Sequence, residues 1–122
     1  MLKFGMVMIG SSQPKVMGDF YEKVLGKAPD FSAAGWYGWT TGDASFSIGE
    51  HSEVKGKAKE PQRVIVNFTA DNVKQEYDRV RRLGAKVVKD LYEMEGMWIG
   101  TFADPDGNYF QITSPFPAEM RK

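Results

Sequence analysis

One amide side chain, that of Gln111, is placed where it could bind a small molecule. It belongs to a run of aromatic and β-branched residues, Tyr109–Thr113, which is typical of a β-strand. Successive side chains of a strand point to opposite faces, so Phe110 and Ile112 share one face while Gln111 lies on the other. An amide on the less apolar face of a buried strand can hydrogen-bond a ligand, and the pattern therefore predicts a ligand position at Gln111.

His51 is the only histidine in the chain. It follows a predicted strand and has the same parity as Ser47, so one interpretation makes it a general base or a lone ligand at the rim of a cleft. The other interpretation is an exposed residue at the end of a strand, ahead of a charged loop. Elsewhere in the chain, just before Tyr109, Asp104 and Asp106 lack the further acidic ligands of a calcium loop and are interpreted as turn residues.

Aromatic residues gather in two runs, 36–39 and 98–102. Trp36, Trp98 and Phe102 could line a pocket that stacks a planar or amphipathic ligand. Alternatively, these rings pack between sheet and helix or at a dimer interface. Four methionines would give a pocket adaptable walls, although methionine fills cores more often: Met6, Met8, Met94 and Met97.

Composition excludes several classes of protein. The 122 residues carry 16 basic and 16 acidic side chains, which argues against a nucleic-acid surface. Cysteine is absent, so disulfide scaffolds and thiolate metal sites are excluded. The N-terminus does not resemble a signal peptide and no segment is long enough to span a bilayer, which predicts a cytoplasmic protein with no membrane partner.

The first half of the chain is predicted to form a strand, a helix and three further strands. Apolar residues recur every three or four positions from Val16 to Val24, Pro14 suits the first helical turn, and Gly26 suits the helix end. The expected strands are Phe4–Ile9, an extended stretch ending at Gly35, Trp36–Thr40 and Ser45–Gly49.

The second half repeats this order. Asn72 and Gln75 resemble a capping box, an apolar stripe runs from Val73 to Leu83, and Gly84 ends the helix. Pro105 and Gly107 suit a tight turn between the last two strands. The expected strands are Arg63–Phe68, Lys86–Tyr92, Met97–Phe102 and Tyr109–Thr113.

The two halves also match residue by residue, which predicts an α+β fold of two tandem βαβββ units. The alternative is a single ordinary α+β sheet with accidental similarity. The expected division is unit one over residues 1–51, a polar linker over 52–60, unit two over 61–115 and a tail over 116–122. The matches are FYEKV at 20–24 with EYDRV at 76–80, WYG at 36–38 with WIG at 98–100, and FSI at 46–48 with FQI at 110–112.

The motifs FYEKVLG at 20–26 and DPDGNYFQI at 104–112, within this doubled unit, resemble the vicinal oxygen chelate superfamily. That group includes glyoxalase I, extradiol dioxygenases, fosfomycin-resistance enzymes and bleomycin-binding proteins. The resemblance covers nearly the whole chain. It implies that each unit curls a mixed sheet into half a cup with its helix outside, that the two halves form a cleft, and that the protein is a homodimer.

The resemblance also indicates where metal ligands would stand. Metal-dependent members use His, Gln and Glu on the first and last strands of each unit, and the matching positions here are Met6, Ser47, Ile65 and Gln111. These side chains cannot hold a catalytic divalent ion, so no metal and no other cofactor are expected. The predicted ligand-binding residues are Met6, Trp36, Ser47, Ile65, Asn67, Trp98, Phe102 and Gln111.

Three functions remain open at this point. The first is a metal-free protein that binds an amphipathic or aromatic small molecule in the cup, comparable with the bleomycin-binding branch. The second is a metal-dependent lyase, isomerase or dioxygenase of the same superfamily. The third is a regulatory subunit whose cleft is vestigial and whose partner is another protein. Neither a catalytic residue nor the identity of the ligand can be assigned from the sequence.

Overall fold

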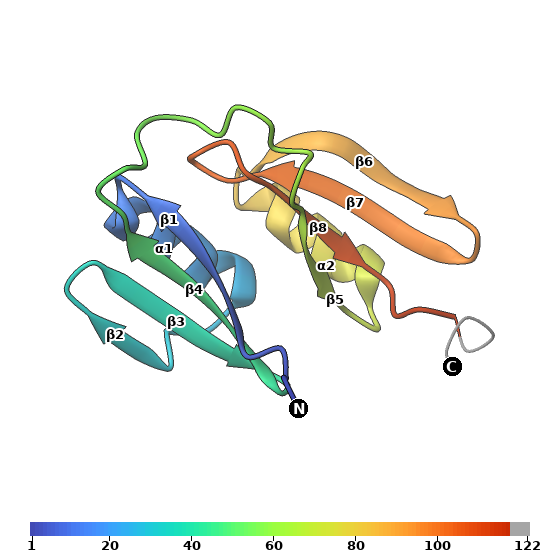
Figure 1. Ribbon diagram of the computed structural model, residues 1–122. Coiled ribbons are helices and arrows are strands. Elements are labelled where there is room, and N and C mark those ends of the chain that lie inside the picture. The colour runs from blue at the N-terminus through green and yellow to red at the C-terminus, as the bar shows by residue number, and fades with distance from the viewer. Residues whose placement is uncertain (118–122) are drawn as a thin grey trace. The chain divides into compact units, whose positions relative to one another are not determined.

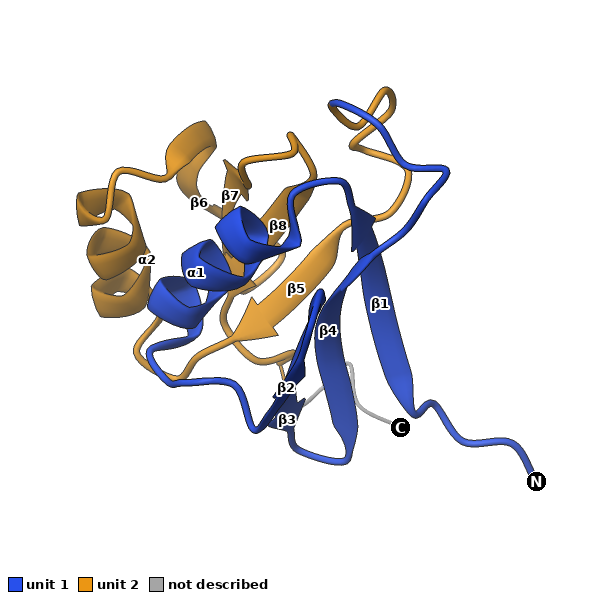
Figure 2. Ribbon diagram, turned by 90° about the vertical axis from the view of Figure 1, so that its left-hand side faces the viewer, with its two compact units in different colours: residues 1–56 blue, residues 57–122 orange. Residues whose placement is uncertain are grey.

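A computed structural model describes residues 1–117 of the protein. The last five residues of the predicted tail, 118–122, therefore lie outside the described part. The chain divides into two compact units, Met1–Gly56 and Lys57–Lys122, coloured separately in Figure 2. Each unit contains a strand, a helix and three strands in that order (Figure 1), which confirms the predicted α+β fold with a repeated βαβββ unit.

Unit 1 is a four-stranded mixed sheet with one helix against it. The strands are ordered β1-β4-β3-β2, with β1 parallel to β4 and the other pairs antiparallel. Helix α1 has Pro14 in its first turn and ends where Gly26 adopts a φ of 74°. The elements are β1 (Met6–Ser11), α1 (Pro14–Leu25), β2 (Phe31–Ala33), β3 (Trp36–Thr41) and β4 (Ala44–Glu50).

Unit 2 repeats the arrangement with the order β5-β8-β7-β6. Here β5 runs parallel to β8, and the β7–β8 and β6–β7 pairs are antiparallel. The elements are β5 (Val66–Thr69), α2 (Val73–Arg82), β6 (Lys86–Met94), β7 (Met97–Ala103) and β8 (Tyr109–Thr113).

Each helix covers one face of its own sheet (Figure 2), and the core of each unit lies between them. Burying each large side chain there contributes roughly 1.5–3 kcal/mol. The buried residues on these helix-facing sides include Met17, Tyr21, Trp39, Phe46 and Ile48 in unit 1, and Tyr77, Val80, Phe102, Phe110 and Ile112 in unit 2.

Some element ends differ from the sequence prediction. Strand β1 begins at Met6 rather than Phe4 and runs to Ser11, because its extent is set by pairing with residues 45–50 of β4. Strand β5 likewise begins at Val66 rather than Arg63, where pairing with β8 starts. The predicted capping box is not formed, since Asn72 makes no side-chain bond to the helix backbone and donates instead to Gln75 Oε1 at 3.0 Å.

The hairpins of the two units are equivalent, but the match of Trp36 with Trp98 is one residue out of register. The buried pair Trp39–Phe46 of unit 1 corresponds to Phe102–Phe110 of unit 2. Trp36 stands three residues before Trp39 on β3, and the residue three positions before Phe102 on β7 is Ile99. The position equivalent to Trp36 in unit 2 is therefore Ile99, not Trp98. A shift of one residue moves a side chain to the other face of a sheet, so the two tryptophans face opposite ways.

Candidate functional site

The side of the unit 1 sheet that faces away from α1 brings together two of the predicted site residues. Ser47 is fully buried on β4, and its hydroxyl donates to Met6 Sδ at 3.3 Å and to the Val7 carbonyl at 3.4 Å. Met6 itself is 46% exposed. The structure thus places Met6 and Ser47 side by side, with the thioether at the surface and the hydroxyl beneath it.

Two aromatic rings lie on glycines of the same face. A Cβ added to Gly49 would stand 2.7 Å from Trp36 Cε3 and 3.1 Å from Met8 Sδ. One added to Gly38 would stand inside the ring of Phe31. The absent side chains of these glycines leave room for the rings to approach the backbone closely.

We call this surface the unit 1 apolar face. Strand alternation assigns to it only uncharged residues from the four strands. Met8 and Phe31 are 39% and 40% exposed, and Trp36 is half-buried. Its members include Met6, Met8, Phe31, Trp36 and Ser47.

Met8 is one of the methionines that the sequence offered as a pocket wall, and it shares the parity of Met6 on the same strand. Phe31 was not anticipated, because the stretch between α1 and β3 has no periodicity that assigns its side chains to a face.

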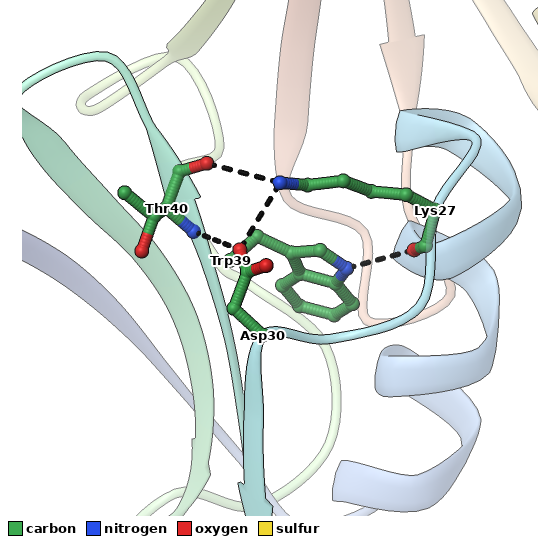
Figure 3. A network of polar contacts seen from close by, with 4 residues as sticks. All are labelled: Lys27, Asp30, Trp39 and Thr40. Carbon is green, nitrogen blue, oxygen red and sulfur yellow. Dashed lines mark hydrogen bonds and ion pairs between the residues drawn. The ribbon is translucent and has the colours of Figure 1, made fainter.

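A network of polar contacts holds the segment that carries Phe31 (Figure 3). The Asp30 carboxylate accepts from the Thr40 amide at 2.6 Å and from Lys27 Nζ at 3.0 Å, and the Trp39 indole donates to the Lys27 carbonyl at 3.0 Å. The Asp30 amide also donates to the Gly38 carbonyl at 2.8 Å. The Thr40 amide and then the Lys27 ammonium hold the pKa of the Asp30 carboxyl below its ordinary value of 3.8.

Unit 2 has a polar counterpart on the side of its sheet that faces away from α2. Gln111 is paired with Asn67 across the parallel strands β5 and β8, and its amide donates to Thr101 Oγ1 at 3.1 Å. Asn67 is exposed and donates to the Ile65 carbonyl at 3.0 Å. Ile65 lies just before β5 and is half-buried. We call Asn67, Thr101 and Gln111 the unit 2 amide face; Thr101 was not anticipated from the sequence.

Two predicted ligand-binding residues lie on the opposite, helix-facing side of the unit 2 sheet. Phe102 is fully buried, with its ring centroid 5.1 Å from that of Tyr77 and 5.5 Å from that of Phe110. Trp98 lies beneath the Lys74 ammonium of α2, which stands 4.4 Å from its ring centroid. Phe102 therefore belongs to the core, and neither residue shares a face with Gln111.

The side chains at the four metal-ligand positions do not fit a catalytic divalent ion. Met6 offers a thioether, Ile65 no donor atom and Ser47 a neutral hydroxyl, which leaves the Gln111 amide oxygen as the one strong oxygen ligand among the four. Hard divalent cations select carboxylate, carbonyl and imidazole ligands. Within residues 1–117, no three His, Cys, Asp or Glu side chains gather as a metal site would require.

The segment between β7 and β8 is a turn, as its sequence predicts. Gly107 has a φ of 83°, and its amide donates to the Asp104 carbonyl at 2.9 Å. The Asp104 carboxylate accepts hydrogen bonds from the amides of Asp106 and Asn108 at 2.9 and 3.0 Å. These bonds stabilise the turn. Lys57 is anchored here too, because its ammonium donates to the Pro105 carbonyl at 2.6 Å.

Tyr77 forms a second polar contact that the sequence did not reveal. Its hydroxyl donates to Asp90 Oδ1 at 2.7 Å. Asp90 lies in an irregular part of β6, where the pairing with β7 shifts between Lys89 and Tyr92, and bulges of this kind redirect side chains. Burial, followed by the neighbouring Asp90 carboxylate, raises the pKa of Tyr77 to about 12.

His51 is exposed just beyond the end of β4, where the sequence placed it. Its Nδ1 accepts a hydrogen bond from the Glu53 amide at 3.1 Å. A Cβ added to Gly10 would stand 3.2 Å from His51 Cβ. Gly10 has the parity of Met6 and Met8, so His51 lies at the end of the unit 1 apolar face.

Comparisons with known proteins agree with the fold. A family model described as a glyoxalase-like domain matches residues 6–113. No curated protein sequence matches the chain significantly. Within residues 1–117, no helix has the length and apolar character needed to cross a bilayer.

Solved structures resemble the chain along most of its length. A glyoxalase/bleomycin resistance protein/dioxygenase family enzyme from Burkholderia phytofirmans PsJN is 22% identical with a TM-score of 0.72, covering 90% of this chain and 96% of that one. A glyoxalase/bleomycin resistance protein from Albidiferax ferrireducens T118 is 17% identical with a TM-score of 0.75, covering 92% and 98%. A lactoylglutathione lyase from Agrobacterium tumefaciens is 17% identical with a TM-score of 0.73, covering 92% of each chain. At these identities the likeness concerns the fold alone.

Proposed function

The chain belongs to the glyoxalase-like domain family, and from that premise we propose that it binds an aromatic or amphipathic small molecule on the unit 1 apolar face, without a catalytic metal. The observation that carries the proposal is the placement of Trp36 and Phe31 on glycines, beside exposed thioethers and with no charged side chain on that face. Rings held in this way offer a stacking surface at little entropic cost.

The donor atoms of this face support binding rather than metal-assisted catalysis. The Ser47 hydroxyl of this face is buried and donates to Met6 Sδ and to the Val7 carbonyl. The exposed thioethers of Met6 and Met8 are polarizable and adaptable, which suits a ligand that binds through dispersion and shape.

The test uses the two tryptophans that the register places on opposite faces. A planar probe such as 1-naphthol should change the tryptophan fluorescence of the wild-type protein saturably. Trp36→Ala should abolish that change. Trp98→Ala is the matched control, because Trp98 lies against α2 and its loss should leave the affinity unaltered. Equal binding by wild type and Trp36→Ala would refute the proposal.

Native mass spectrometry of freshly purified protein addresses the ligand and the metal together. The proposal expects a retained organic molecule or an empty protein that takes up the probe. A stoichiometric divalent metal would instead support the metal-dependent lyase, isomerase or dioxygenase activity of other superfamily members.

We further propose that the protein is a homodimer. Met6, Met8 and Phe31 share the unit 1 apolar face and are 46%, 39% and 40% exposed, and an exposed apolar patch favours self-association. Closed twofold dimers are the commonest assembly. Light scattering should report about twice the chain mass of 13.7 kDa; a monomer at all accessible concentrations would contradict the proposal.

A further inference from the structure

We propose that a cavity beside His51 binds a small oxyanion, such as a phosphate or carboxylate group. The cavity measures about 580 Å³ and lies wholly within unit 1. Small-molecule sites occupy about 300–1,000 Å³. We call it the His51 cavity, and its lining residues are Ser12, Glu50, His51, Ser52, Val54 and Lys55.

The cavity lies at the carboxyl ends of two neighbouring parallel strands. Ser11 of β1 pairs with Glu50 of β4 as the last pair of the parallel ladder. Ser12 and His51 follow directly. In open α/β sheets, ligands bind beyond the carboxyl ends of parallel strands. The His51 cavity lies at the corresponding end of the β1–β4 pair.

Hydrogen-bond donors predominate in the lining. Within the described residues, no hydrogen bond or ion pair engages the side chains of Ser12, Ser52 or Lys55. His51 Nδ1 accepts from the Glu53 amide, so the hydrogen-bond network assigns the imidazole hydrogen to Nε2, which is left to donate. Two hydroxyls, one ammonium and one imidazole N–H match the acceptor oxygens of an oxyanion.

Glu50 is the one carboxylate in the lining. It repels an anion, so it weakens binding and selects ligands that also carry a hydroxyl able to donate to it. Neutralising Glu50 should therefore strengthen the binding of a bare oxyanion, whereas removing the Lys55 ammonium should weaken it.

The loop that carries His51 is held in place before any ligand arrives. The His51 amide donates to the Ser11 carbonyl at 3.3 Å, and the Val54 amide donates to the His51 carbonyl at 3.1 Å. A Cβ at Gly10 would stand 3.2 Å from His51 Cβ and from Val54 Cγ2, so the loop packs closely on the β1 backbone. Preorganisation of this kind reduces the entropic cost of binding.

The chain has a single histidine. The imidazole signals in a proton–nitrogen NMR spectrum therefore belong to His51 without ambiguity. Inorganic phosphate is titrated into the full chain at constant pH and at ionic strength balanced with sodium chloride. The His51 ring signals should shift saturably, with a Kd on the order of 1 mM, because the lining charges are solvent-exposed. Acetate forms a second arm that separates a carboxylate ligand from a phosphate ligand.

Variants decide whether the shift reports this cavity. Lys55→Ala should weaken phosphate binding about two- to fivefold, the effect of losing one exposed charge contact, and Glu50→Gln should strengthen it. Lys59→Ala, which removes a lysine of the same linker outside the lining, should leave it unchanged. Backbone spectra of each variant verify folding.

A linear shift that never saturates with either anion, or equal affinity in wild type and Lys55→Ala, would overturn the proposal. Binding of 1-naphthol to the unit 1 apolar face is measured separately, so either proposal can fail alone.

Discussion

The indole ring of Trp36 lies on the backbone of Gly49, its partner across the β3–β4 hairpin. A Cβ at Gly49 would come within 2.7 Å of Trp36 Cε3, closer than side chains approach one another. The position of the ring, and with it the unit 1 apolar face, therefore depends on the absence of a single methyl group.

Gly49→Ala should displace Trp36 and destabilise the protein by about 1–3 kcal/mol, the usual cost of overpacking a close contact. Denaturant unfolding measures the loss, and the affinity for 1-naphthol should fall with it. Gly5→Ala is the control, since a Cβ at Gly5 would meet nothing within 4 Å. If the two variants unfold at the same denaturant concentration, position 49 tolerates a Cβ and the prediction is wrong.

The order of elements could be predicted from the sequence because it depends on local signals. Helix periodicity, Pro14 and Gly26 define α1, and the φ of Gly107 and the Asp104 side chain define the turn before β8. The alternation of β8 likewise placed Phe110 in the core and Gln111 on the other face.

The faces of the aromatic residues could not all be predicted, because they depend on strand register. The β7–β8 connection is one residue longer than the β3–β4 connection when measured between equivalent core pairs, Phe102–Phe110 and Trp39–Phe46. The similar sequences WYG at 36–38 and WIG at 98–100 align Trp36 with Trp98. The hydrogen-bonded pairs of the two hairpins align Trp36 with Ile99 instead. Trp98 consequently lies under Lys74 rather than beside Gln111.

Tyr77 should make stability depend on pH in the alkaline range. Its pKa is raised from 10.0 to about 12 in the folded state, so the neutral hydroxyl stabilises the fold fully below pH 10. That contribution is lost progressively as the pH rises towards 12, because the unfolded chain ionises first. Denaturant unfolding at several pH values in this window should show a smaller pH dependence for Tyr77→Phe than for wild type.

Asp90→Asn provides the companion variant to Tyr77→Phe. It keeps the Tyr77 hydroxyl but removes the charge beside it, so the pKa of Tyr77 should fall towards its ordinary value. Absorbance of the phenolate form should then appear at lower pH than in the wild type. An unchanged titration would mean that burial alone sets the pKa.

Asp30 should make stability depend on pH in the acid range. Its pKa is held below 3.8 in the folded state, so the carboxylate contributes stability that is present above that value. The contribution is lost as the pH falls through the folded-state pKa. Unfolding measured from neutral pH downwards should show a weaker acid dependence for Asp30→Asn than for wild type, whereas Asp43→Asn, at an exposed site in the β3–β4 turn, should resemble the wild type.

Zinc, nickel and manganese should leave the melting temperature unchanged apart from nonspecific effects. A site that bound one of them would stabilise the native state by about 2.7 kcal/mol at a hundredfold excess over Kd, which thermal unfolding would detect. A concentration-dependent rise that Gln111→Ala abolishes would show that the donor set had been misjudged. The enzyme hypothesis would then take precedence.

Lys57 leaves the ribosome 48 residues ahead of Pro105, the residue whose carbonyl it contacts. Every strand that unit 1 needs for its own sheet has been synthesised by Glu50. N-terminal units generally fold first during translation. Unit 1 can therefore form while Lys57 still lacks its partner, the Pro105 carbonyl. The hydrogen bond from Lys57 to the Pro105 carbonyl can therefore form only after the β7–β8 hairpin has been synthesised, late in folding.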